Sequence, residues 1–240
     1  ISSTSSAPWP PWGAPARTAS WIQLFSTSHP KPPPTPPASI SLSRRVLYST
    51  LIFIAGVILG LASKALETTL SNSLPYFLEV LDLRNFFSRM GVWIFLALLI
   101  SVYSKSPVRS AINVFLFFVG MVGSYYLFTV LVAGFFPGSY MMIWIIMTCI
   151  SPLMAFLCWY AKGKGIIAIS LSSIIVLFIS RQAFLFGFWY FDIRSYLELL
   201  IWIATIFVLY QSPKQIIKVV TIGLLLFFIT AQINLFWGML

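Results

Sequence analysis

The side chains best able to do chemistry lie at the ends of long apolar runs. Lys64 and Glu67 follow the first run, Arg89 precedes the second, Arg181 ends the fifth and Glu198 opens the sixth. Successive membrane-spanning helices alternate in direction, so these five positions fall on one side of the bilayer, which we expect to be the outer side. Their convergence would form an outward-facing pocket for a small zwitterionic or anionic solute.

Three aromatic residues are candidates for the walls of this pocket. Trp93 lies one helical turn after the start of the second run, and Trp189 and Tyr190 follow the fifth run. The simpler alternative is that the charged side chains reach the headgroup region and pair there, for example Arg181 with Glu198.

A second candidate pocket lies at the opposite ends of the runs. Asn113, Lys105 and Arg109 lie close together around one short loop and are suited to binding lipid phosphates. The alternative is that the two basic residues serve only to orient the chain in the membrane.

Several kinds of chemistry lack the residues that they need. The single histidine, His29, lies outside the apolar runs, and no Asp or Glu falls in the middle of a run. HExxH, Walker A and glycine-rich dinucleotide motifs are absent. Cys149 and Cys158 are nine residues apart, on nearly opposite faces of a helix, so neither a disulfide nor a shared metal is expected. We predict no catalytic residue, no metal and no cofactor, and an enzyme acting on lipid is the least favoured class.

The composition indicates that lipid surrounds most of the chain. Hydrophobic residues make up 59% of the 240 residues and charged residues 8%, against about 25% charged in soluble domains. The apolar runs are continuous rather than alternating, so we predict an all-α polytopic membrane helix bundle, not a barrel. Seven crossings are expected, at residues 46–62, 90–104, 110–136, 140–160, 165–180, 195–210 and 219–237.

Basic residues are distributed unequally between the two sides that these crossings define. One side receives eight Lys and Arg residues and no acid: Arg44, Arg45, Lys105, Arg109, Lys162, Lys164, Lys214 and Lys218. The other receives five Lys and Arg residues with all five acids. The positive-inside rule therefore predicts that the N-terminus is inside and the C-terminus outside. The net charge of +10 is explained by the basic residues that orient the chain in the membrane, so no nucleic-acid partner is expected.

Residues 1–43 differ in composition from the rest. They are rich in Ser, Thr and Pro, contain no acid and begin with Ile1. Such a segment cannot build a core, so we predict a disordered tail. Its possible origins are a tag scar, a translated upstream region or an acid-poor, transit-like leader. Residues 44–240 form the predicted transmembrane helical domain.

Small residues and repeated loops indicate how the helices pack. Gly56 and Gly60 form a GxxxG pair, and Gly120 and Gly123 a second close pair, which lets helices approach each other. The segments around Pro107 and Pro213 also look alike, each with a short run before the loop. We weigh an internal repeat, as in many transporters, against a common Ser-Pro solution for a short loop.

Residues 91–165 resemble a family of uncharacterised bacterial polytopic integral membrane proteins, a domain of unknown function. The segments that carry the resemblance are GVWIFLALLISVYSKSPVRSAINVFLFFVGMVGSYYL, FFPGSYMMIW and SPLMAFLCWYAKGKG. The resemblance implies a multi-pass protein of the bacterial inner membrane, and it carries no activity and no residue roles. In size and basic inner loops the chain also resembles the substrate-binding subunits of energy-coupling vitamin transporters.

The function that these observations favour is binding or transport of a small solute, alone or as the membrane subunit of a larger transporter. The candidate ligand-binding residues are Lys64, Trp93, Arg181, Trp189, Tyr190 and Glu198. The alternative is an accessory, immunity-type or structural membrane protein that acts through helix–helix contacts. In that case the glycines would face a protein partner, and no pocket would exist.

Overall fold

A computed structural model describes residues 42–69, 76, 80–134, 138–187 and 189–231. The chain divides into two units, 1–41 and 42–240, and only the second is described. The prediction of a disordered tail over residues 1–43 therefore falls almost entirely outside the described residues. The first helix begins at Leu42, so its first turn includes the end of the predicted tail.

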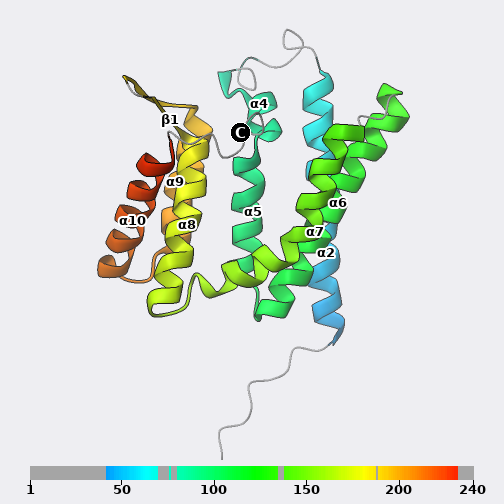
Figure 1. Cartoon of the computed structure of the whole chain (residues 1–240). Helices are drawn as coiled ribbons and strands as arrows, with labels where there is room; N and C mark the ends of the chain where they lie inside the picture. The colour runs from blue at the N-terminus through cyan, green and yellow to red at the C-terminus, as the bar shows by residue number, and fades with distance from the viewer. Residues whose placement is uncertain (1–41, 70–75, 77–79, 135–137, 188, 232–240) are drawn as a thin grey trace, which may run out of the picture. The chain divides into compact units, whose positions relative to one another are not determined.

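The described residues form helices and one small β-hairpin (Figure 1). Each predicted crossing overlaps one apolar helix, with ends that differ from the prediction by up to six residues. The predicted end of the seventh crossing, at residues 232–237, lies outside the described residues. The elements are α2 (Leu42–Thr68), α4 (Leu83–Ser88), α5 (Met90–Tyr103), α6 (Pro107–Phe128), η2 (Thr129–Ala133), α7 (Gly138–Tyr160), α8 (Ile166–Ala183), β1 (Phe184–Phe186), β2 (Phe191–Ile193), α9 (Tyr196–Leu209) and α10 (Pro213–Ala231).

Five of the described helices are long and apolar enough to cross a membrane: α2, α6, α7, α8 and α10. The architecture is that of a multi-pass membrane protein, as the composition predicts. The other two apolar helices, α5 and α9, have 14 residues each. At 1.5 Å per residue each is about 21 Å long, which is shorter than the bilayer core of about 30 Å.

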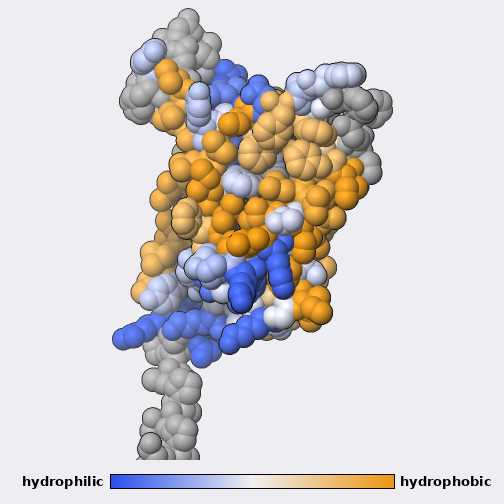
Figure 2. All heavy atoms as spheres, turned by 90° about the vertical axis from the view of Figure 1, so that its left-hand side faces the viewer, coloured by the Kyte–Doolittle hydropathy of each residue, from blue (hydrophilic) through white to orange (hydrophobic). Residues whose placement is uncertain are grey.

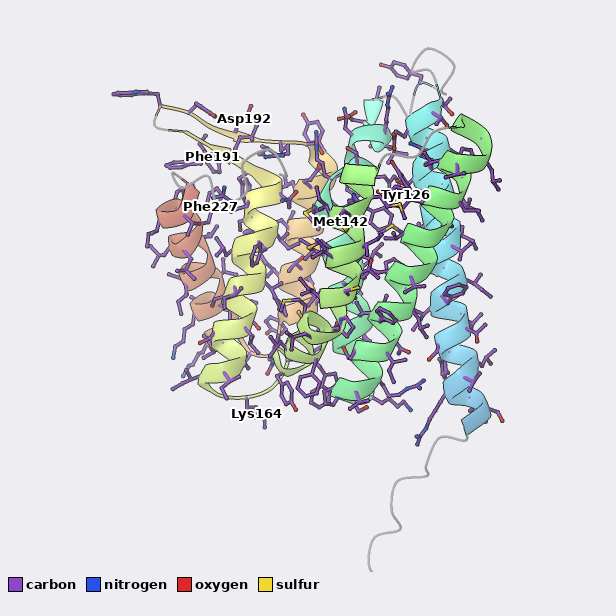
Figure 3. The ribbon with its side chains drawn as sticks, turned by 45° about the vertical axis from the view of Figure 1, so that its right-hand side comes forward. Tyr126, Met142, Lys164, Phe191, Asp192 and Phe227 are labelled. Carbon is purple, nitrogen blue, oxygen red and sulfur yellow. The ribbon has the colours of Figure 1, made fainter. Side chains whose placement is uncertain are left out.

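The segment after the fifth apolar run corrects the purely helical prediction. Helix α8 ends at Ala183, and residues 184–186 pair antiparallel with residues 191–193. Phe184 stacks on Phe191 with ring centroids 5.4 Å apart, and Phe227 of α10 lies 6.2 Å from Phe184 (Figure 3). The hairpin therefore packs against the end of α10.

The helices form two similar three-helix units joined by α7. In each unit the first helix packs mainly on the third, α2 on α6 and α8 on α10. The second helices, α5 and α9, pack against each other, and α5 lies at the centre of the bundle (Figure 1). The order of elements is the same in both units, but the second helix packs differently: α5 packs on the third helix of its unit, α6, whereas α9 packs mainly on the first helix of its unit, α8.

The loops that join the second and third helices are also built alike. Helix α6 begins at Pro107 and α10 at Pro213, each directly after a serine. The Ser106 hydroxyl accepts a hydrogen bond from the Arg109 N–H at 3.2 Å, and the Ser212 hydroxyl accepts one from the Gln215 N–H at 3.4 Å. Both helices thus start with a serine cap and a proline in the first turn. The likeness around Pro107 and Pro213 in the sequence therefore extends to the structure of the two loops.

Three of the four predicted packing glycines lie where α2 crosses α6. A Cβ on Gly56 would lie 2.2 Å from the Phe117 carbonyl oxygen, and one on Gly60 would lie 2.3 Å from that of Met121. Gly120 approaches α2 in the same way. Gly123 does not share this contact, because a Cβ there would meet no atom of the described residues within 4 Å.

Helix α7 continues through Pro152, where the sequence predicts a kink. Proline has no N–H to offer the carbonyl four residues earlier, which belongs to Thr148. The Ser151 hydroxyl donates to that carbonyl instead, at 2.8 Å. The carbonyl therefore keeps a partner at a depth where water is scarce.

Charged and apolar residues are separated along the helix axes. Figure 2 shows an apolar band across α8 and α10, with hydrophilic side chains at both of its ends. Lys164 lies at one end of the bundle and Asp192 at the other (Figure 3). We call these the Lys164 end and the Asp192 end. They correspond to the basic and the mixed-charge sides that the sequence defines.

Candidate functional site

At the Asp192 end, Lys64 and Glu67 lie within α2 rather than after it. Lys64 is 4% exposed, and its Nζ donates to Glu67 Oε1 at 2.8 Å. The ammonium also lies 4.8 Å from the centre of the Tyr125 ring. The Tyr125 hydroxyl donates to the second oxygen of Glu67. A buried lysine thus gains a carboxylate and an aromatic face, which offset the loss of its hydration.

Beside this cluster is a small cavity bounded by α2, α4, α5, α6 and α7. Its volume is about 30 Å³, which is room for one or two water molecules. Glu67 and Arg84 bring opposite charges to it, and Trp93, Tyr125 and Trp144 supply aromatic walls. The cavity has the polar and aromatic groups of a solute site, but its present volume is too small for a solute of several heavy atoms.

A second, larger cavity continues towards the membrane interior. It holds about 340 Å³ and lies between α5 and α6 of the first unit, α8 of the second unit, and α7. Trp93 and Trp144 line this cavity as well as the small one. Its lining runs along α5 from Met90 to Ser101, a rise of about 17 Å. The large cavity is therefore between the two three-helix units, among the apolar helices of the bundle.

The lining of the large cavity is almost entirely apolar. Its inner wall is buried and includes Leu98, Val114 and Ala155. The hydroxyls of Ser101 and Ser151 bond to carbonyls of their own helices, so they offer little to a ligand. Several side chains of α7 and α8 on its rim are exposed: Met147, Ile150, Met154, Leu157, Ile174 and Phe178. The cavity consequently opens sideways between α7 and α8, towards the lipid.

Glu198 belongs to a separate cluster of charges where α5 meets α9. Its side chain is 2% exposed, and Arg89 Nη1 donates to Glu198 Oε1 at 2.6 Å. The Ser195 hydroxyl donates to its other oxygen. Asp82 lies 3.8 Å from Arg89. This ion pair joins the first turns of the two central helices, one from each three-helix unit.

The three remaining predicted residues do not line either cavity. Arg181 donates to the Thr230 carbonyl at 2.7 Å and so ties α8 to α10. The pairing of Arg181 with Glu198, which the sequence suggests, is replaced by the Arg89–Glu198 pair. Trp189 is 92% exposed, and Tyr190 is also exposed, at the turn of the hairpin. The predicted single pocket is therefore divided among three places.

At the Lys164 end, the second candidate pocket is a network of internal hydrogen bonds. The Ser49 hydroxyl donates to Asn113 Oδ1 at 2.8 Å. Arg109 donates to the Arg45 carbonyl at 2.7 Å and to the Ser49 hydroxyl at 3.1 Å. Lys105 is exposed. Asn113 and Arg109 thus connect α2 to α6.

Sequence reasoning missed several residues that line or border these sites. Trp144 lies in the middle of an apolar run, where nothing in the sequence separates a cavity wall from a lipid-facing side chain. Tyr125 follows Gly123 by two residues, and only the crossing of α2 and α6 brings it to Glu67. Gln182 could have been recognised from the sequence as a candidate polar residue of a site. It lies next to Arg181 at a helix end, where a side-chain amide seldom finds its hydrogen-bond partners within the same helix.

The described residues contain no group of three or more His, Cys, Asp or Glu side chains that could hold a metal ion. Comparison of the chain with models of protein families, with curated proteins and with solved structures finds no match. The function has therefore to be inferred from the geometry of the sites.

Proposed function

We propose that this protein binds and moves a small amphiphilic solute, alone or as the membrane subunit of a transporter. The observation that carries the proposal is the 340 Å³ cavity between the two three-helix units. Transporters built from parallel repeats bind their substrates near the middle of the bilayer, where the repeats meet. The position of the large cavity fits that arrangement.

The size and lining of the large cavity support a solute with an apolar part. A dry cavity of about 150 Å³ lined by apolar side chains is enough to bind benzene. The cavity here is more than twice as large, and its lining is apolar. Each buried CH₂ group contributes about 0.8 kcal/mol to binding. A short alkyl chain or ring system therefore gains substantial affinity there.

The small cavity supports a polar group at one end of the solute. Because Trp93 and Trp144 line both cavities, a solute with its apolar part in the large cavity has its other end beside Glu67 and Arg84. These opposite charges suit a zwitterionic group or an anionic one. A polar end larger than one or two water molecules needs an outward movement of α4.

We also propose seven crossings, with the N-terminus inside and the C-terminus outside. The concentration of basic residues at the Lys164 end supports this orientation. The matching order of helices in the two three-helix units supports crossing by α5 and α9. The bilayer can thin locally around helices of this length at modest cost. Placement in a bacterial inner membrane rests only on the resemblance of residues 91–165.

Single cysteines in a cysteine-free background test this topology. We expect cysteines at Asn85 and Asp192 to react with a membrane-impermeant maleimide in intact cells. Cysteines at Lys105 and Lys214 should react only after the membrane is permeabilised, because α5 and α9 separate the two sets. Labelling of Asn85 and Lys105 from the same side would show that α5 does not cross.

Filling the large cavity tests the proposed solute site. We expect a brominated medium-chain fatty acid to quench the fluorescence of Trp93 and Trp144 saturably in detergent-solubilised protein. Ala97→Phe places a ring in the cavity and displaces at least three CH₂ groups of the ligand, so its affinity should fall by more than about tenfold.

The matched control is Ala55→Phe, which adds the same ring to an exposed position of α2. It should leave the quenching curve unchanged. Quenching that does not saturate in the parent protein, or that is equal in Ala97→Phe and Ala55→Phe, would count against the solute site.

An accessory protein that acts by helix contacts remains the second candidate. One observation favours it: Gly123 faces an open apolar groove of about 530 Å³ between α6 and α7. The other three glycines are already in contact within the chain. Three of the four glycines are therefore not available to a protein partner, which supports the solute-binding proposal over the alternative.

A further inference from the structure

A second polar site lies at the Asp192 end of the interface between the two three-helix units. Gln182, in the last turn of α8, is 2% exposed, and its Oε1 has no hydrogen-bond partner among the described residues. An ideal Cβ on Gly91 would lie 3.9 Å from that oxygen, so Gln182 faces the first turn of α5. Buried polar atoms are normally satisfied, which indicates that a partner is missing here.

Arg194 brings an unsatisfied donor to the same corner. Its backbone N–H bonds to the carbonyl of Ala183, the residue after Gln182, at 2.9 Å. Its Nε is buried and has no acceptor among the described residues. Burial lowers the pKa of the Arg194 guanidinium, and the nearby charge of Arg89 lowers it further, while Glu198 acts in the opposite direction. The guanidinium thus lies in a place where positive charge is only partly compensated.

The charged groups around Arg194 have a net positive charge, which favours binding of an anion. Arg89, Arg181 and Arg194 carry three positive charges, whereas Glu198 and Asp82 carry two negative ones. Both oxygens of Glu198 already accept hydrogen bonds from other groups. An added negative group would therefore be attracted by the excess positive charge. The Glu198 carboxylate is already engaged in its own hydrogen bonds.

The start of α5 adds donors to this corner. Helix α5 begins at Met90, and its cap residue, Arg89, provides no side-chain acceptor for the first N–H groups. These groups carry the partial positive charge of a helix N-terminus, which favours anions. Gln182 faces this turn, so the unsatisfied amide oxygen of Gln182 lies close to the N-terminus of α5.

We propose that Arg194, Gln182 and the N-terminus of α5 bind a phosphate group, carried by a lipid headgroup or free in solution. Phosphate oxygens accept from Arg194 Nε and from the first N–H groups of α5. A hydroxyl of the phosphate, or of a glycerol headgroup, donates to Gln182 Oε1. Gln182 and Arg194 line neither cavity, whereas Met90, at the start of α5, also lines the large one.

The full chain in dodecyl maltoside micelles, which contain no phosphate, allows a direct test by thermal unfolding. We expect the unfolding midpoint to rise with inorganic phosphate if the ligand is free, or with phosphatidylglycerol added to the micelles if it is a headgroup. Arg194→Gln should weaken the response at least about tenfold, because it removes a charged hydrogen bond. Gln182→Leu should weaken it as well, without lowering the midpoint in the absence of phosphate, since the lost oxygen has no partner among the described residues.

The matched control is Arg44→Gln, which removes one positive charge from an exposed position in the first turn of α2. It should keep the full response. The proposal is overturned if neither phosphate nor phosphatidylglycerol stabilises the parent, or if Arg194→Gln and Gln182→Leu respond as Arg44→Gln does. Should Arg194→Gln not fold, Gln182→Leu decides the outcome.

Discussion

Replacing Glu198 by Leu is expected to lower the free energy of unfolding by about 3 kcal/mol, because it takes the buried partner away from a half-buried guanidinium and leaves it only the more distant Asp82. Glu198 is 2% exposed and bonds to Arg89 at 2.6 Å, at the contact between the two three-helix units. Its loss also removes a negative charge that stabilises the charged form of Arg194. Unfolding in mixed micelles, followed by circular dichroism, measures the effect.

The double variant Arg89→Met/Glu198→Leu distinguishes the ion pair from simple packing. Replacing both charges by apolar side chains of similar size is often neutral or stabilising, so we expect the double variant to regain most of the lost stability. Asp192→Asn changes an exposed carboxylate at the same end and should have almost no effect. A Glu198→Leu variant as stable as Asp192→Asn would contradict the role given to this pair.

The Gly56→Ala variant is expected to lose about 1–3 kcal/mol of stability, because its new methyl group collides with the backbone of α6. The ideal Cβ lies 2.2 Å from the Phe117 carbonyl oxygen, and neither helix backbone can yield without moving apart. That movement would also stretch the bond from the Ser124 hydroxyl to the Val57 carbonyl, now 3.0 Å. The midpoint of unfolding in mixed micelles reports the loss.

Gly123→Ala is the matched control on α6. Its Cβ meets nothing among the described residues within 4 Å, so alanine should be neutral or stabilise the helix by about 0.5–1 kcal/mol. Equal losses in Gly56→Ala and Gly123→Ala would mean that α2 and α6 do not cross at Gly56.

Sequence and structure agree most closely on the helices. Long apolar runs must satisfy their backbone groups internally, so the positions of α2, α6, α7, α8 and α10 followed from hydropathy alone. The residues at which the helices begin and end were less predictable. Lys64 and Glu67 extend α2 by a turn beyond its apolar run, because their pairing with each other and with Tyr125 makes a helical position favourable.

The candidate site was only partly predictable. Lys64, Trp93 and Glu198 are buried at the Asp192 end, where the sequence placed a pocket. Trp189 and Tyr190 were expected in the same pocket, but residues 184–186 pair with residues 191–193 in a hairpin, and both aromatic side chains are exposed at its turn. Short strands pair through the backbone, and an aromatic-rich segment gives little sign of which turn it will take.

The sequence by itself determined that the chain is a helical membrane protein, because continuous apolar runs leave the backbone no other way to satisfy its hydrogen bonds in lipid. It also determined which helix ends are basic. Only the tertiary structure decided which charges meet: Glu198 pairs with Arg89, 109 positions away, and Arg181 bonds to a carbonyl of α10. Pairing across helices depends on how the two three-helix units dock, and docking is set by contacts such as those of Gly56 and Gly60 that no local pattern specifies.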